Sequence, residues 1–361
     1  MLKQFAFAVA FAGILSGGAQ AADIPAAQGL NTAQRATLQK LIDSALKEGS
    51  LNYADTIIQP NVSKELVQAF HKYYGLPDSF QVSFTLLGSA AMVTRIGQEI
   101  AANRVTLDVA AVASPAWAFD AHRKGYMMEY ASPQYAAYKA AFAAGLGVDG
   151  AFAFNGGYSQ VPIWNSAIVD FHGTTYADVV KAAKPERFSI GDVSHSESQL
   201  ATYVGLRQIY KPDFFKEIAK KKPAFIYRSE VSAQRVLTGQ DMFALGGGAS
   251  RVMSANQKGA KLKILYPTEG FTLLPQSTFI LKAAPHPNAA KLWIDFVLSE
   301  TGQEIICRRE ALISGRSGFK SPVPGLVPEF GAIKVIKVDW RAMTPDRLRQ
   351  YRAEWEKIFT P

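Results

Sequence analysis

Serine residues gather in one short segment at the point where an expected strand ends and a helix begins. The segment GDVSHSESQLATYVGL, residues 191–206, contains Ser194, Ser196 and Ser198 directly before a helical pattern. The first two serines each have Glu or Gln three residues later, so they fit helix capping boxes. The same helix start would expose unpaired backbone N–H groups and a positive dipole end, which favour an anion. Capping and anion binding are compatible, and the sequence leaves both open.

Other expected strand ends have the same character. Ser89 and Ser114 each stand at the start of an expected helix, and Gly247 and Gly248 close an expected strand. In open α/β sheets, ligands bind at the carboxyl ends of the strands. Each position alone could be only a tight turn, but together they come from both halves of the chain. A cleft between two lobes would bring such edges together.

Motifs for catalysis, metal binding and nucleotide binding are missing. The sequence has no GxSxG, HExxH or CxxC, and GGGAS at 246–250 is neither a Walker loop nor GxGxxG. The five histidines are dispersed. A secreted hydrolase that uses Ser194 or Ser196 with His195 is an alternative, but no fixed spacing supports it. We therefore expect a binding protein, not an enzyme, with no cofactor and no metal.

Length and charge set further limits. The chain has 361 residues, which is longer than a domain with a single hydrophobic core usually is, so two domains are expected. The net charge is +9, but the basic residues are scattered and form no stripe for a nucleic acid. A diffuse positive field can still attract small anions.

The first residues have the layout of a secretory signal peptide. Lys3 precedes an apolar stretch at 5–15, and the small-residue sequence AQA ends at Ala21. This pattern predicts cleavage between Ala21 and Ala22. No later stretch approaches the about 18 uninterrupted apolar residues of a membrane span. We expect a soluble mature protein in the bacterial periplasm.

Helical and strand patterns alternate along the chain. Helices are expected at 34–48 and 89–103, and strands at 51–55, 80–88 and 107–113. This order predicts an α/β domain with a parallel sheet.

The middle of the chain repeats the alternation. The expected strands of this second unit are 160–165, 188–193, 241–248 and 261–267. The second unit is inserted into the first, because the chain leaves the first near Gly157 and returns near Glu269.

Several segments resemble the periplasmic substrate-binding proteins of ABC transporters, in the group with ferric-ion-, thiamine-, phosphonate- and sugar-phosphate-binding members. The matching segments are ALKEGSLNYAD (45–55), RIGQEIAANRVTLDVAAVASPAW (95–117), YADVVKAAKPERFSIGDVSHS (176–196) and, most specifically, ILYPTEGFTLLPQSTFILKAAPHPNAAKLWIDFVLSETGQE (264–304). The resemblance implies a two-lobed α/β fold of the type II, transferrin-like class, with a hinge of two crossing segments. The implied bounds are 1–21 for the signal peptide, 22–157 plus 270–361 for lobe 1 with a C-terminal helical tail, and 158–269 for lobe 2.

The resemblance also implies a function. A monomer of this kind captures a solute between its lobes and delivers it to an inner-membrane ABC permease. The implied ligand contacts are Ser89, Ser114, Tyr158, Ser194, Ser196, Gly247, Gly248 and Glu269. A ligand-carrying partner of a membrane sensor would use the same fold and is an alternative.

The expected ligand follows from a departure from the ferric-ion-binding members. Those members use two adjacent tyrosines near the helix that begins here SHSESQLATY, where this chain has only Tyr203. Serine hydroxyls and backbone N–H groups suit acceptor-rich ligands. We therefore expect a small anion, namely a phosphonate, phosphate ester or carboxylate, with ferric ion as the alternative.

Overall fold

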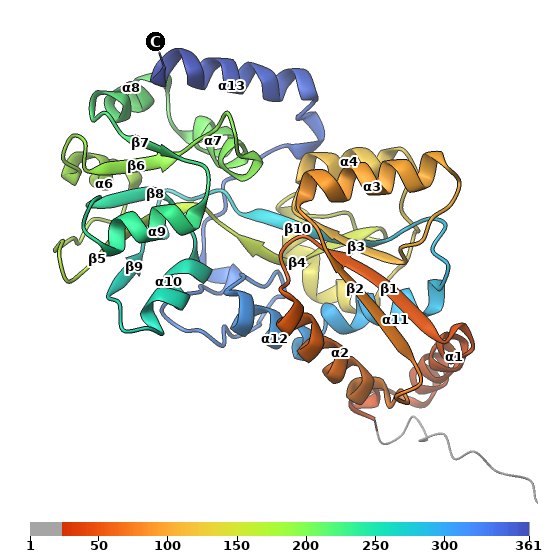
Figure 1. The fold of residues 1–361 in the computed structure, drawn as a ribbon. Helices are drawn as coiled ribbons and strands as arrows, with labels where there is room; N and C mark the ends of the chain where they lie inside the picture. The colour runs from red at the N-terminus through yellow and green to blue at the C-terminus, as the bar shows by residue number, and fades with distance from the viewer. Residues whose placement is uncertain (1–23, 361) are drawn as a thin grey trace, which may run out of the picture.

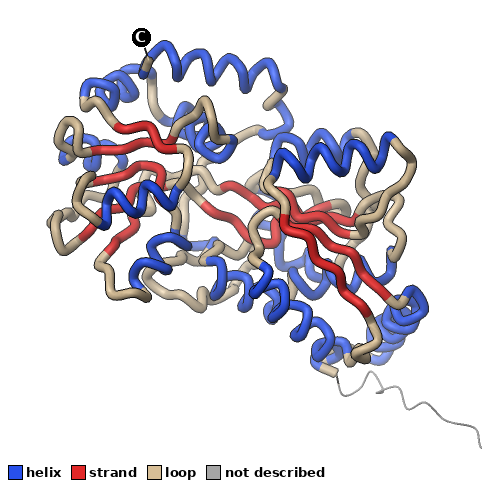
Figure 2. The backbone as a smooth tube through the Cα atoms, in the orientation of Figure 1, coloured by secondary structure: helices blue, strands red, loops and turns tan. Residues whose placement is uncertain are grey.

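A computed structural model describes residues 24–360 of the chain, and the predicted signal peptide lies outside these residues. Two five-stranded sheets form its framework, and helices cover their faces (Figures 1 and 2). The strand orders are β2-β1-β3-β10-β4 and β7-β6-β8-β5-β9. We call the half built on the first sheet lobe 1 and the half built on the second sheet lobe 2. The predicted two-lobed α/β fold is therefore confirmed.

The strands of lobe 1 are β1 (Ser50–Asp55), β2 (Gln81–Leu86), β3 (Val109–Val112), β4 (Phe152–Tyr158) and β10 (Leu274–Ile280). Its helices are α1 (Thr32–Glu48), α2 (Pro60–Tyr74), α3 (Ser89–Ala101), α4 (Pro115–Arg123), α5 (Lys139–Ala143), α11 (Pro287–Val297) and α12 (Glu300–Glu310). The strands of lobe 2 are β5 (Val161–Asn165), β6 (Phe188–Gly191), β7 (Ala224–Ile226), β8 (Phe243–Gly247) and β9 (Leu262–Ile264). The remaining helices are α6 (Tyr176–Ala182), α7 (Glu197–Ile209), α8 (Pro212–Lys220), α9 (Ser229–Leu237), α10 (Ala249–Asn256) and α13 (Pro345–Phe359).

Both sheets are mixed, whereas the sequence predicts a parallel sheet. β10 runs antiparallel to β3 and β4, and β5 runs antiparallel to β8 and β9. These two strands are the ones that the chain enters directly after crossing from the other lobe. Each therefore runs antiparallel to its neighbours, unlike the strands that helices connect within a lobe.

The two expected crossing segments join the lobes at the hinge, and a third connection leads later from α12 to α13. β4 ends at Tyr158 in one sheet, and β5 begins at Val161 in the other. Ser159 and Gln160, which join them, are both buried. The chain returns to lobe 1 between the end of β9 and the start of β10.

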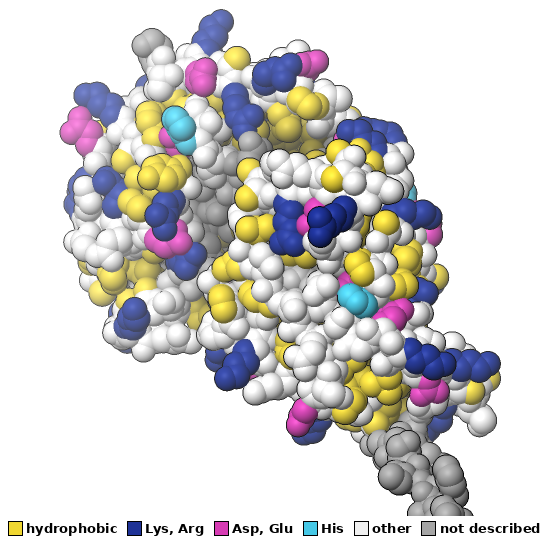
Figure 3. Space-filling model, turned by 45° about the vertical axis from the view of Figure 1, so that its right-hand side comes forward, with side chains coloured by type: hydrophobic (Ala, Val, Ile, Leu, Met, Phe, Trp, Pro, Cys, Tyr) yellow, Lys and Arg dark blue, Asp and Glu magenta, His cyan; other side chains and the backbone are white. Residues whose placement is uncertain are grey.

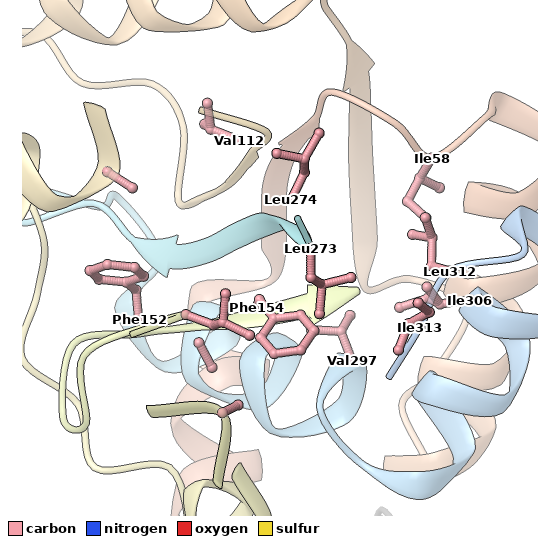
Figure 4. Close-up of a cluster of buried hydrophobic side chains, with 14 of the residues drawn as sticks. Ile58, Val112, Phe152, Phe154, Leu273, Leu274, Val297, Ile306, Leu312 and Ile313 are labelled. Carbon is pink, nitrogen blue, oxygen red and sulfur yellow. The ribbon is translucent and has the colours of Figure 1, made fainter. Parts of the chain in front are cut away.

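Two glycines allow close packing at the hinge. A Cβ atom at Gly156 would lie 2.7 Å from Leu312, and one at Gly157 would lie 2.7 Å from Leu273. A larger residue would therefore force Leu312 or Leu273 to shift. Phe154, a neighbour in the same strand, lies in the buried cluster with Leu273 and Leu312 (Figure 4). The hinge strand is therefore fixed in the core of lobe 1.

The C-terminal helix differs from the predicted division of the chain. The predicted bounds place the whole tail with lobe 1, but α13 packs against α7 and α8 of lobe 2. Its buried Trp355 and Phe359 face Phe225, with ring centroids 5.1 and 6.0 Å apart. The apolar face of this amphipathic helix thus finds its complement on the second sheet. The other predicted bounds of the lobes stay a prediction.

The helices of the described residues and the face drawn in Figure 3 bear on membrane and nucleic-acid contacts. Within residues 24–360, no helix combines the length and apolar character needed to span a bilayer. Lys and Arg side chains are scattered over both lobes on the face drawn in Figure 3, with Asp and Glu among them. This face has no basic stripe of the kind that binds nucleic acids.

We predict that Trp355→Ala lowers the free energy of unfolding by about 3–5 kcal/mol, because it leaves a cavity between α13 and lobe 2. Urea denaturation measures this change. The matched control is Lys357→Ala on the exposed face of the same helix. Equal effects of the two substitutions would show that α13 adds no packing energy to lobe 2.

Candidate ligand-binding cleft

A cavity of about 450 Å³ lies between the two lobes. The turn after β1 and the turn after α12 line it from lobe 1, and the starts of α9 and α10 line it from lobe 2. Its lining residues are Thr56, Ile57, Gln59, Gly157, Tyr158, Ser159, Ser229, Glu230, Gly248, Ala249, Ser250, Arg251, Tyr266, Glu310, Ala311, Leu312 and Ile313. The volume is in the range of small-molecule sites. We call this cavity the cleft.

Two helices of lobe 2 begin at the cleft. Ser229 and Glu230 start α9, and Gly248 is the residue before α10. Gly248 offers no side-chain cap to the helix, and a Cβ atom there would meet nothing within 4 Å. The first N–H groups of α10 therefore have room for an outside acceptor. Both helices direct the positive end of their dipole toward one cavity.

Arg251 is the cationic side chain among the described residues that line the cleft. Its Nη2 atom lies 2.6 Å from Oε1 of Glu230, also in lobe 2. Its Nε atom is buried and has no hydrogen-bond partner. A buried N–H without an acceptor is costly, so an acceptor on a ligand would be stabilising here.

Two buried carboxylates fix the turn of lobe 1 that lines the cleft. Asp55 accepts hydrogen bonds from the backbone N–H of Ile57 (2.6 Å) and of Ile58 (2.8 Å). Glu310 accepts from the backbone N–H of Gln59 at 2.9 Å. Burial raises the pKa of Asp55 to about 6, although these donors oppose the shift. Burial also raises the pKa of Glu310.

A smaller cavity of about 50 Å³ adjoins the cleft at Tyr158, which lines both. Ser198 also lines this smaller cavity, and burial raises the pKa of Tyr158 to about 12. The hydroxyls of Ser196 and Ser198 lie 3.1 Å apart. This pair of serines stands at the start of α7, and Ser198 faces the smaller cavity.

The structure brings only some of the predicted ligand residues together. Tyr158 and Gly248 line the cleft, and Ser114 lines the smaller cavity with Tyr158. Ser196 caps α7 by accepting from the N–H of Gln199 at 3.4 Å, and it joins the site only through its neighbour Ser198. Capping therefore explains this serine without a ligand.

The other predicted ligand residues do not line the cleft. The Ser194 hydroxyl lies 3.1 Å from the Glu356 carboxylate of α13, so the chain itself supplies an acceptor there. Glu269 accepts from the N–H of Tyr176 (2.7 Å) and from the hydroxyl of Tyr210 (2.6 Å). Both residues make contacts that brace the fold.

Two predicted positions lie inside or near the sheets. Gly247 is buried in β8, where a Cβ atom would lie 2.3 Å from Ile163. The Ser89 hydroxyl lies 3.5 Å from the carbonyl oxygen of Ala113. The ligand-binding roles of Ser89 and Gly247 stay predictions.

The charged residues of the cleft were missed by the sequence analysis. Arg251 follows the predicted strand end at Gly248 by three residues, so its place in the first turn of α10 could have drawn attention to it. Glu310 gives no such local signal, because the fold brings the end of α12 to the turn after β1.

The histidines do not support the hydrolase alternative. Nδ1 of the exposed His195 lies 2.9 Å from Asp192, whereas Ser194 and Ser196 hydrogen-bond to Glu356 and Ser198. Among residues 24–360, no group of three or more His, Cys, Asp or Glu side chains is placed to hold a metal ion.

A separate hydrogen-bonded arrangement of Ser, His and Asp lies at the start of β1, outside the residues that line the cleft. Nε2 of His286 is 3.0 Å from Ser50, and its Nδ1 is 2.9 Å from Asp108. The same buried carboxylate accepts from the backbone N–H groups of His286 and Asn52. These bonds tie α11 to the sheet, which gives the arrangement a structural role.

Comparisons with known proteins agree with this architecture. Residues 55–309 match the family model of the bacterial extracellular solute-binding proteins. Iron-bound HitA from Pseudomonas aeruginosa is similar in structure, with a TM-score of 0.68, 16% identity and coverage of 86% of this chain and 99% of HitA. The binding protein AfuA from Actinobacillus pleuropneumoniae, with fructose-6-phosphate bound, has a TM-score of 0.67, 18% identity and coverage of 86% and 98%. No curated protein sequence matches significantly.

We predict that Asp55→Asn flattens the pH dependence of stability. The folded state raises the pKa of Asp55 from 3.8 to about 6, so the folded protein holds this proton more tightly than the unfolded chain. This contribution is present when the group is protonated, and it is lost as pH rises from about 4 through 6. The free energy of unfolding of the wild type relative to the variant should fall by about 2 kcal/mol between pH 4 and 7.

Urea titrations at several pH values measure this difference. The exposed Asp43 provides the control, because Asp43→Asn should leave the pH profile of the wild type unchanged. A constant difference between the wild type and Asp55→Asn across this range would contradict the account of the buried carboxyl.

Proposed function

The chain belongs to the family of bacterial extracellular solute-binding proteins, and from this premise we propose that it captures a small anionic solute for an ABC importer. The proposed solute is a phosphonate, phosphate ester or carboxylate. It would be held in the cleft between the lobes and then delivered to an inner-membrane permease.

One observation carries the proposal of an anion. The starts of α9 and α10 and the unpartnered Nε–H group of Arg251 meet at one cavity between the lobes. An anion that leaves water needs a donor for each of its oxygen atoms. Backbone N–H groups at helix starts and a guanidinium group provide charge-assisted donors that are already in place.

The hinge supports capture by closure. The cleft is lined from both lobes, and the lobes are joined by short crossing segments. A solute that contacts both lobes binds the closed form more tightly than the open form, so it shifts the population toward closure. Closure would also exclude water from the bound solute.

The place of action follows from the family and from the predicted signal peptide. We propose that the chain is exported, cleaved between Ala21 and Ala22, and works as a monomer in the periplasm. Transport by a permease requires the solute to be released unchanged, which agrees with a family of binding proteins.

Ferric ion is the second candidate, because HitA, a structural neighbour, is iron-bound and because Tyr158 and Tyr266 line the cleft. Iron would need these groups as phenolates. The Tyr266 hydroxyl donates to the carbonyl oxygen of Leu326 at 3.1 Å. Burial raises the pKa of both tyrosines, which favours the neutral phenols. We therefore place the anion first.

We predict that Arg251→Met weakens binding of the anion by about 10–100-fold, because one charge-assisted hydrogen bond contributes about 1.5–3 kcal/mol. A thermal-shift screen over phosphonates, phosphate esters, carboxylates and ferric ion first identifies a ligand, since binding raises the melting temperature. Calorimetric titration then compares the variant with the wild type.

The control is Lys258→Met beyond the C-terminal end of α10, at an exposed lysine that does not line the cleft. This control variant should bind the anion as tightly as the wild type does. Stabilisation by ferric ion and by none of the anions would reject the proposed solute class. Equal affinity of Arg251→Met and the wild type would reject the site.

A further inference from the structure

Charged side chains line the cleft from both lobes. Three charged side chains lie among the described residues that line it, namely Arg251, Glu230 and Glu310. On lobe 2, Glu230 pairs with Arg251 at 2.6 Å and with Arg228, which does not line the cleft, at 3.8 Å. Glu310 lies at the end of α12 on lobe 1 and remains as an additional carboxylate. A solute with only negative charge would therefore meet a favourable pole of the cleft at Arg251 and an unfavourable pole at Glu310.

Glu310 is in a setting that favours a cationic partner. Its side chain is buried at 9% exposure, and its Oε1 atom accepts from the N–H of Gln59. A carboxylate at this depth has lost most of its hydration, so a positively charged donor beside it would be stabilising. Arg251 and Arg309 act on it through space, but each pairs with another carboxylate, Glu230 or Glu65.

The backbone after Glu310 holds this carboxylate at the cleft. Ala311 ends α12 in the left-handed region, with φ of 51° and ψ of 40°, where glycine is the usual residue. The turn that it makes sends Leu312 and Ile313 back along β4, where the N–H of Gly157 donates to the carbonyl oxygen of Ile313 at 2.8 Å. The end of α12 is thus fixed against the hinge strand.

From this arrangement we infer that the solute is zwitterionic, with an ammonium group received by Glu310 and an anionic group received by Arg251 and the starts of α9 and α10. This inference rests on the proposed function, since it adds a second recognition group to the same cleft. The two poles lie on opposite lobes, so a solute with both charges would bridge them. Glu310 is then the residue that separates zwitterions from simple anions.

The test uses two series of probes that differ only at one end. The phosphate series is ethyl phosphate, 2-hydroxyethyl phosphate and 2-aminoethyl phosphate, and the carboxylate series is propionate, 3-hydroxypropionate and 3-aminopropionate. Calorimetric titration of the purified protein gives an affinity for each. We expect the amine of the binding series to bind at least about 10-fold more tightly than its alkyl parent, with the alcohol between them.

Glu310→Gln then tests the residue. The glutamine keeps an oxygen acceptor for the N–H of Gln59 but removes the charge. We expect the amine to lose its advantage, to within about threefold of the alkyl parent, while the alkyl parent binds as in the wild type. Glu304→Gln, on the same helix and paired with Arg308, is the control and should preserve the full ranking.

The outcomes separate the two proposals. If none of the six probes binds, both the proposed function and this inference are overturned. If the alkyl anions bind as well as the amines, or the alcohols bind best, the cleft takes an anion but the zwitterion is rejected. The wild-type ranking alone decides the inference if Glu310→Gln fails to fold, which circular dichroism would show.

Discussion

The structure depends on the short connection between its two sheets. Only Ser159 and Gln160 separate the last residue of β4 from the first residue of β5. Both are buried, and β4 packs closely against Leu312 at Gly156 and against Leu273 at Gly157. The lobes therefore cannot drift apart, and the strand ends and helix starts beside the connection must face each other. The cleft is the direct consequence of this constraint.

The cleft joins two different kinds of surface. Lobe 2 contributes helix starts and a guanidinium group, which are donors, whereas lobe 1 contributes a turn whose N–H groups are already bound to Asp55 and Glu310. A solute that fits both must present acceptors to one lobe and donors to the other. Neither lobe alone offers partners to both kinds of group on the solute. Closure of the lobes therefore depends on the solute.

Much of the fold could be predicted from the sequence, because local patterns determine it. The strand expected at 107–113 contains β3 and is visible as an apolar run, and the helix expected from Ser89 begins at that residue. β4 is harder to recognise, because Gly156 and Gly157 weaken a strand pattern and are required only by packing against distant residues. The antiparallel course of β10 depends on the crossing between lobes, which no local pattern encodes.

The site was less predictable than the fold, because it depends on contacts between residues that are far apart in the sequence. Helix starts are local features, so the predicted residues include Gly248, which lines the cleft, but the acceptor that Ser194 meets comes from Glu356 in the distant α13. Glu310 reaches the cleft only through tertiary packing.

The most direct measurement is a crystal structure of the protein with the solute it carries from its periplasm. The account predicts that solute between the start of α10 and Glu310, with the lobes closed on it. A solute bound elsewhere, with the cleft left to water, would contradict the account.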